Sequence, residues 1–248
     1  MQMYSICIDP FVYREKSKEV SGFLVRLPPL KTKKPSDLAL HHVLSLPTLI
    51  KNQNWNAVCD RVAKYPQEAG EELQAMTRGG FMSTSGFTPL HYACERRPPV
   101  EVVQALITAW PESVTARVLP GGALPLHVAC TWHASDSVVR VLTHAEPAAC
   151  RIPDDLGNIP LHCAVFAGAD IHVLDVLLRV FPKSALARNH QGSLAGDIIK
   201  RLRHDNRKAA MERVKAATDS IVTFQHQRNR SNGSCSAVAQ RAIELNTL

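Results

Sequence analysis

A short segment recurs three times in this 248-residue chain, and its spacing constrains the fold more than any other feature. Each copy contains a Pro-Leu-His sequence, whose histidines are 36 and then 35 residues apart: His91, His127 and His162. A second landmark keeps the same spacing, because a proline follows each histidine by 20 residues: Pro111, Pro147 and Pro182. Two landmarks that share one period predict a stack of similar structural units.

Each repeat is predicted to contain two helices followed by a turn. A proline suits the first position of a helix, since its missing N–H would have no partner there. The second helix has apolar residues at the spacing of a buried stripe. These residues are Val102, Val103 and Leu106, then Val138, Val139 and Leu142, then Val173, Leu174 and Leu177. Glycine in the turns at 119–122, 154–157 and 189–192 allows the positive φ of a tight return.

Further units are expected at both ends of the stack. Upstream, residues 55–65 followed by Pro66 read as a second helix, which makes 38–46 its first helix. Downstream, Asp197 lies 35 residues after His162 in a degenerate copy. One helix pair cannot bury its own apolar face, so the units must stack to form a core.

We therefore expect one repeat domain over 38–217, with about five units. Its predicted parts are a degenerate first unit and loop at 38–85, units at 86–121, 122–156 and 157–191, and a capping unit at 192–217. The basic segment 1–37 and the polar tail 218–248 are expected to be disordered.

The residues from Gly86 to Ala93 resemble the ankyrin repeat family, because they match its Gly-x-Thr-Pro-Leu-His-x-Ala signature in full. The next two copies match it in part, and the resemblance covers about 85–200. It implies an all-α solenoid of helix-turn-helix units with short hairpin-like turns. It also implies a non-enzymatic adaptor or scaffold that grips a protein partner with its turn tips and the exposed ends of its first helices.

The register of the three histidines places these implied contacts on particular residues. They are Phe87, Glu95, Arg96, Thr131, Trp132, Asp155, Leu156, Asn158 and Phe166. We expect Trp132 and Phe166 to form an apolar centre flanked by Arg96 and Asp155, since aromatic residues are common binding hot spots. The alternative is that the two aromatic side chains pack on each other or under a long loop.

The histidines and cysteines imitate metal-ligand spacing in His91-x-x-Cys94 and His127-x-x-Cys130. Equivalent positions on stacked helices lie roughly 8–10 Å apart, whereas zinc ligands lie about 2.0–2.3 Å from one metal. This geometry argues against a metal site. The resemblance to the ankyrin repeat implies instead that each histidine bonds backbone or a neighbouring unit's turn, and we expect each cysteine to be a small buried residue. With neither a nucleophile elbow nor a phosphate-binding loop, the sequence predicts no catalytic residue, cofactor or metal.

The net charge of +7 is concentrated in the terminal segments, since it is +3 over 1–38, −2 over 39–199 and +6 over 200–248. The basic segment 200–248 supports an alternative function, recruitment to nucleic acid or an anionic membrane. Two features argue against it: Phe224 is its one aromatic residue, and 200–216 lacks the Trp, Phe and Leu face of a membrane-surface helix.

The remaining expectations concern the environment of the protein. Seven scattered cysteines indicate a reducing compartment. Neither a secretory signal nor an apolar run of about 18 residues is recognisable. We therefore expect a monomeric cytoplasmic or nuclear protein that is neither secreted nor transmembrane, with an unidentified protein as its partner.

Overall fold

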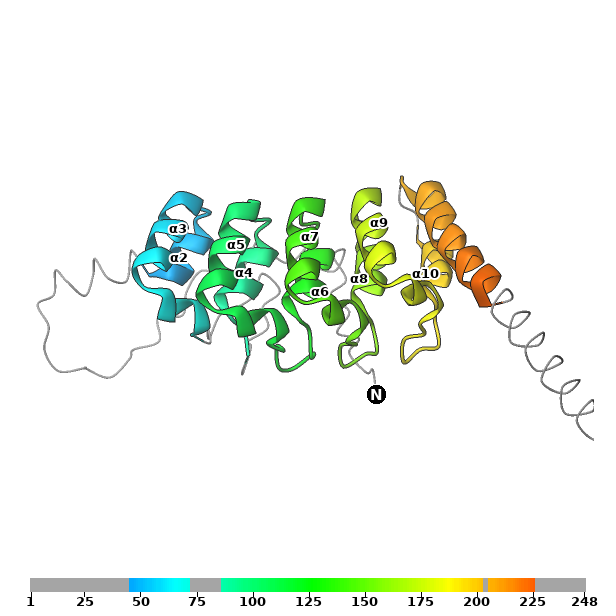
Figure 1. The fold of residues 1–248 in the computed structure, drawn as a ribbon, viewed down its shortest axis with the longest axis horizontal. Helices are drawn as coiled ribbons and strands as arrows, with labels where there is room; N and C mark the ends of the chain where they lie inside the picture. Colours follow the sequence, from blue (N-terminus) through cyan, green and yellow to red (C-terminus); the bar gives the residue numbers. More distant parts are fainter. Residues whose placement is uncertain (1–44, 72–85, 203–204, 226–248) are drawn as a thin grey trace, which may run out of the picture.

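The computed structural model describes residues 45–71, 86–202 and 205–225. Five helix pairs follow one another along the stack in Figure 1. They are α2 (Leu46–Lys51) with α3 (Trp55–Lys64), α4 (Pro89–Glu95) with α5 (Val100–Ala109), α6 (Pro125–Thr131) with α7 (Asp136–Ala145), α8 (Pro160–Ala167) with α9 (Ile171–Val180), and α10 (Ala195–Arg201) with a helix over 207–225. The described ranges contain no β-strand.

The helices form two layers that share one core. The first helices contact one another in the order α2, α4, α6, α8 and α10, and the second helices in the order α3, α5, α7 and α9. The core between the layers contains equivalent leucines from successive units: Leu90, Leu126 and Leu161 from the first helices, and Leu106, Leu142 and Leu177 from the second. The predicted all-α solenoid is confirmed.

In the first four pairs, proline ends the second helix and begins a short 3-10 helix. These 3-10 helices are η1 (Pro66–Gly70), η2 (Pro111–Thr115), η3 (Pro147–Arg151) and η4 (Pro182–Leu186). The residue before each proline has left the helical region, with φ between −134° and −145°. A proline ring disfavours helical backbone in the residue before it, so these prolines define the helix ends, as predicted.

The first unit differs from its prediction. Its first helix is α2, which begins at Leu46 after the N-cap Ser45, with Pro47 in its first turn. The predicted helix over 38–46 is therefore wrong at its C-terminal end, and residues 38–44 lie outside the described part of the chain. Leu46-Pro47 repeats the Leu124-Pro125 pair that starts α6. That pair was the signal for the correct helix start.

The last unit also extends further than predicted. The final helix continues to residue 225, so the expected disorder is wrong for residues 218–225. Ala210 and Val214 join the shared core, and Asn206 donates a 2.6 Å hydrogen bond to the carbonyl of Ala169 in the preceding unit. The expected disorder of 1–37 and 226–248 lies outside the described residues. None of the helices within the described ranges is long and apolar enough to cross a bilayer.

Candidate partner-binding site

The repeated histidine connects each unit to the next. His91 Nδ1 accepts the N–H of Thr88 at 3.2 Å, and His91 Nε2 lies 3.3 Å from the carbonyl oxygen of Ala123 in the following unit. An N–H can only donate and a carbonyl can only accept, so the ring is the neutral tautomer with its proton on Nε2. The prediction that the histidines bond backbone and neighbouring turns is confirmed.

The other two histidines repeat this geometry. The Nδ1 atoms of His127 and His162 accept the N–H groups of Leu124 and Ile159 at 3.1 and 3.3 Å. The Nε2 atom of His127 lies 3.0 Å from the carbonyl oxygen of Asn158 in the next unit, and that of His162 lies 3.2 Å from the carbonyl oxygen of Ala187, between η4 and the turn that leads into the next unit. Both ring nitrogens of each histidine are therefore occupied within the stack.

Burial keeps these side chains neutral. It lowers the pKa of His91 to about 3 and that of His127 to about 4, and it also lowers the pKa of His162. Cys94 and Cys130 are buried apolar residues as predicted, and burial raises the pKa of Cys94 to about 12. In the described part of the chain, no three His, Cys, Asp or Glu side chains gather into a possible metal site.

The turn tips are joined to one another by a second set of hydrogen bonds. The N–H of Asp155 donates to the carbonyl of Gly121 at 3.0 Å, and the Asp155 carboxylate accepts the N–H of Gly121 at 2.9 Å. One unit later, the N–H of His190 donates to the carbonyl of Leu156 at 3.0 Å. The tips therefore form a connected edge along the stack rather than independent loops.

A buried chain of polar side chains lies beneath two of these tips. Asp154 Oδ1 accepts the N–H of Asn158 at 2.7 Å, and Asn189 Oδ1 accepts the N–H of Ser193 at 2.9 Å in the next unit. The Asn189 amide donates to Asn158 Oδ1 at 3.0 Å, which links the two turns. Asn158 therefore holds the tips together instead of presenting its amide to solvent.

Burial corrects the expected exposure of three predicted contact residues. Phe87 is 3% exposed, Glu95 is 2% exposed and Asn158 is 2% exposed. Phe87 stacks on the His91 ring at a centroid distance of 5.6 Å, which explains its burial. Asn158 is buried where the Asn189 amide donates to its side chain, and Glu95 is the last residue of α4, inside the stack. These three residues are not surface contacts.

Three other predicted contacts are accessible in part but bond within the chain. The half-buried Arg96 lies over the Tyr92 ring at 5.1 Å and donates to its hydroxyl at 3.2 Å. The Thr131 hydroxyl donates to the carbonyl of His127 at 2.9 Å. Asp155 is exposed, but its carboxylate accepts the N–H of Gly121 as described above.

The two predicted aromatic anchors differ from each other. Trp132 and Phe166 are both half-buried and packed against the core, so packing accounts for part of each ring. Trp132 lies at the C-cap of α6, where its carbonyl accepts a 2.8 Å hydrogen bond from Arg97 Nε. Phe166 lines a pocket, and Trp132 is not among the residues that line it.

That pocket lies where α8, α10 and the two tips before them meet. Its volume is about 80 Å³. It brings together three predicted residues, Leu156, Asn158 and Phe166, with six that the sequence did not single out as contacts: Asn189, Gln191, Ser193, Ile198, Arg201 and Leu202. The sequence signal for these six was the position of Asp197, which placed α10 one repeat after α8 and so beside it.

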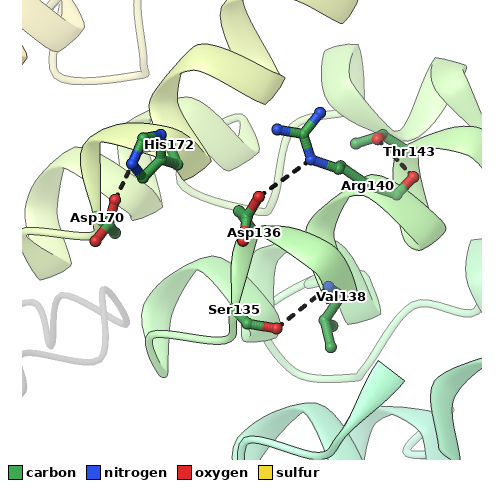
Figure 2. Close-up of polar contacts among 7 residues, drawn as sticks. All are labelled: Ser135, Asp136, Val138, Arg140, Thr143, Asp170 and His172. Carbon is green, nitrogen blue, oxygen red and sulfur yellow. Dashed lines mark hydrogen bonds and ion pairs between the residues drawn. The ribbon is translucent and has the colours of Figure 1, made fainter. Parts of the chain in front are cut away.

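The starts of the second helices, by contrast, carry capping and pairing interactions within each helix (Figure 2). Ser135 Oγ accepts the backbone N–H three residues further on at 3.4 Å, and Asp170 Oδ1 accepts the N–H two residues further on at 2.8 Å. Arg140 pairs with Asp136 at 3.1 Å on α7. These side chains stabilise helix ends, as Ser and Asp commonly do at N-caps. The pocket is the stronger candidate for a binding site.

Comparison with known proteins agrees with the repeat geometry. Residues 85–117, which contain α4, α5 and η2, match the family model described as the ankyrin repeat. A comparison with curated proteins found no match. The matched segment includes His91, whose two-sided hydrogen bonding recurs in the next two units. The chain is therefore an ankyrin-like solenoid of stacked helix pairs, with an ankyrin repeat identified at residues 85–117.

Proposed function

We propose that this chain is a non-enzymatic protein-interaction module that binds a partner segment in the pocket between α8 and α10. An ankyrin repeat by itself indicates a protein-interaction module. The observation that supports a specific site is the pocket in which Phe166 and Leu156 meet Ile198 and Leu202 from the last unit. Concave sites with an apolar lining and a few polar groups are typical of binding sites.

The apolar side chains that line the pocket keep accessible surface that a partner can bury. Leu156, Phe166 and Leu202 are each only half-buried. Covering apolar surface contributes about 25 cal/mol for each Å² removed from water. An aromatic residue at the centre of such a surface contributes disproportionately, and its truncation commonly costs about 2 kcal/mol of binding free energy.

The hydrogen-bonded tips favour binding because they fix the pocket before a partner arrives. The Asn158–Asn189 side-chain bond and the bond between the His190 N–H and the Leu156 carbonyl hold both tips that form the pocket. A preorganised site spends less of its interaction free energy on ordering loops. The proposed site is therefore formed by tips that hydrogen bonds already hold in place rather than by flexible loops.

Affinity capture with matched variants tests the proposal. The full chain, Phe166→Ala and Val180→Ala are each immobilised, and retained proteins are identified by mass spectrometry. Val180 is the matched control, because it is an exposed aliphatic residue at the end of α9 outside the pocket. We expect a set of proteins that the wild type and Val180→Ala retain and Phe166→Ala loses, with circular dichroism showing that all three are folded. Identical retention by all three proteins would contradict the proposed site.

The alternative function, recruitment to nucleic acid or an anionic membrane, rests on the basic character of 200–248. In the described part of that segment, the helix over 207–225 carries two acidic residues among its four basic ones, and Arg213 pairs with Asp175 at 3.5 Å. Mixed charge weakens attraction to a polyanion. Retention of the full chain on heparin at about 0.15 M salt, where surface electrostatics are strongly screened, would favour this alternative.

A further inference from the structure

The volume of the pocket limits which side chain can enter it. A cavity of about 150 Å³ lined by aliphatic and aromatic residues holds a benzene ring. At about 80 Å³, the pocket between α8 and α10 has roughly half that space. It therefore fits an aliphatic side chain of the size of valine, leucine or isoleucine better than an aromatic ring. The apolar walls provided by Phe166, Ile198 and Leu202 suit such a group.

Most polar groups in the lining already have partners. Asn189 Oδ1 accepts the N–H groups of Gln191 and Ser193, at 3.1 and 2.9 Å, and its amide donates to Asn158. These groups form the floor of the pocket and have little capacity left for a ligand. The exposed polar side chains of the lining are those of Gln191 and Arg201, which we place at the rim.

Arg201 is the charged member of the lining, and its charge is uncompensated. In the described ranges, it makes no ion pair, and no acidic residue lines the pocket. The neighbouring Lys200, by contrast, pairs with Asp197 at 3.4 Å. The pocket therefore combines apolar walls with a positive rim, and its complement carries an aliphatic group beside a negative one.

We infer that the pocket recognises a peptide segment of a partner protein in which an Asp or Glu lies close to an aliphatic residue. This inference rests on the proposed function and specifies the partner. The aliphatic side chain enters between Phe166 and Ile198, and the carboxylate pairs with the guanidinium of Arg201, which can bind it in a bidentate manner. The Gln191 amide can both donate to and accept from the peptide backbone.

Selection from a random dodecapeptide library displayed on phage tests this inference with the full chain. The enriched peptides are then synthesised, and their binding is measured by fluorescence polarisation. We expect the enriched sequences to share an aliphatic position and a nearby Asp or Glu. Replacing that acidic residue with Asn or Gln is expected to weaken binding about tenfold, as for a charge pair at an interface.

Two charge reversals provide the decisive comparison. Arg201→Glu is expected to weaken binding of the selected peptides by about tenfold or more, since it replaces attraction with repulsion. Arg179→Glu is the matched control, because Arg179 is exposed on α9 outside the pocket. It is expected to leave binding within about twofold, because Arg179 does not line the pocket and salt screens exposed charges. Urea unfolding of each variant checks that the fold is retained.

The possible outcomes separate this inference from the function on which it rests. If the selected peptides show no acidic position, or bind Arg201→Glu as well as wild type, acidic recognition is overturned. The proposed pocket still stands in that case, provided that Phe166→Ala abolishes binding. If no peptide is enriched over an unrelated protein, or if Phe166→Ala binds as well as wild type, both the inference and the proposed site are overturned.

Discussion

The middle units and the last unit differ at one repeated position. His91, His127 and His162 occupy it in the middle of the stack, and Asp197 occupies it in α10. Each side chain accepts the N–H at the start of its own helix, which for Asp197 is the N–H of Leu194 at 3.3 Å. His91 and His127 also reach forward to the next unit, and His162 reaches the carbonyl of Ala187 just before the next turn, whereas Asp197 turns to Lys200 on its own helix, 3.4 Å away.

This difference shows what the stack requires at that position. An internal unit needs a side chain that accepts on one side and donates on the other, and a neutral imidazole does both. A carboxylate only accepts, so it can start a helix but cannot bond the carbonyl of a following turn. The end of the repeat series is thus marked by the loss of the donor rather than by the loss of the helix.

Exchanging the two residue types is expected to produce the largest effect. His127→Asp keeps the acceptor for the N–H of Leu124, but it loses the donor to the carbonyl of Asn158 and buries a carboxylate without a partner. Leaving a buried charge uncompensated costs about 3–5 kcal/mol. Urea unfolding followed by circular dichroism measures the loss, which we expect to split the transition as neighbouring units uncouple.

The reverse exchange is the control. Asp197→His retains an acceptor for the N–H of Leu194 and gives up only the exposed pair with Lys200. Its unfolding midpoint in urea is expected to match that of the wild type closely. Similar losses for the two exchanges would show that the internal and terminal positions have the same requirement.

The turn glycines extend the same comparison to the tips. Gly157 and Gly192 are equivalent, with φ values of +76° and +73°, but an added Cβ at Gly157 would lie 2.7 Å from the backbone N of His190. Nothing lies within 4 Å of the corresponding position at Gly192, among the described residues. Gly192→Ala is therefore expected to cost about 1 kcal/mol of backbone strain, and Gly157→Ala about 3 kcal/mol because the clash adds to it.

Thermal and urea unfolding of both glycine variants measures this difference. Equal destabilisation would mean that the tip of an internal unit is not in contact with the following tip. A smaller loss for Gly157→Ala than for Gly192→Ala would contradict the connected edge outright.

Acid is expected to affect the internal units first. The folded-state pKa of each buried histidine lies below the value of about 6.5 in an unfolded chain, so the unfolded state binds more protons between the two values. The contribution of the neutral histidines to the free energy of unfolding is therefore fully present above about pH 6.5. It falls as the pH drops toward about 4, by up to about 1.4 kcal/mol per pH unit for each histidine.

The carboxylate of the last unit gives a pH dependence of the same sign, but at a lower pH. The N–H of Leu194 and the side chain of Lys200 lower the pKa of Asp197, so its contribution is lost only below the ordinary range for aspartate. Urea unfolding at pH 7, 6 and 5 tests whether the histidines lose their contribution to stability at a higher pH than Asp197 does. A stability that stays constant over this interval would contradict neutral buried histidines. Adding salt is expected to leave the change of unfolding free energy with pH largely unchanged, because burial rather than charge–charge interaction is the main cause of the lowered histidine pKa values.

Much of the fold followed from residues whose effect is local. Proline restricts the backbone before it, so Pro111, Pro147 and Pro182 gave the ends of the second helices directly. The histidine spacing likewise indicated the repeat, and the resemblance to the ankyrin repeat implied the bonds to backbone and neighbouring turns. The start of α2 was missed because its unit has Leu46-Pro47 without the following Leu-His.

The candidate site was harder to predict because it depends on contacts between units. Nothing near Asn158 in the sequence reveals that Asn189 approaches it, since the two residues are 31 positions apart. One spacing does recur in the two turns: Asp154 lies four residues before Asn158, and Asn189 lies four residues before Ser193. This recurrence indicated that the two turns are equivalent. Arg201 lies in the segment predicted to be a capping unit, although the same register places it beside Phe166 at the pocket.

The most direct test of the histidine-linked stack is nitrogen-15 NMR of the imidazole rings at pH 5.5. We predict that His91 and His127, whose pKa values burial lowers to about 3 and about 4, are neutral at this pH, with a protonated Nε2, an unprotonated Nδ1 and slow exchange of the Nε2 proton with water. Imidazolium rings at these positions, or neutral rings protonated on Nδ1, would contradict the hydrogen bonds that join each unit to the next.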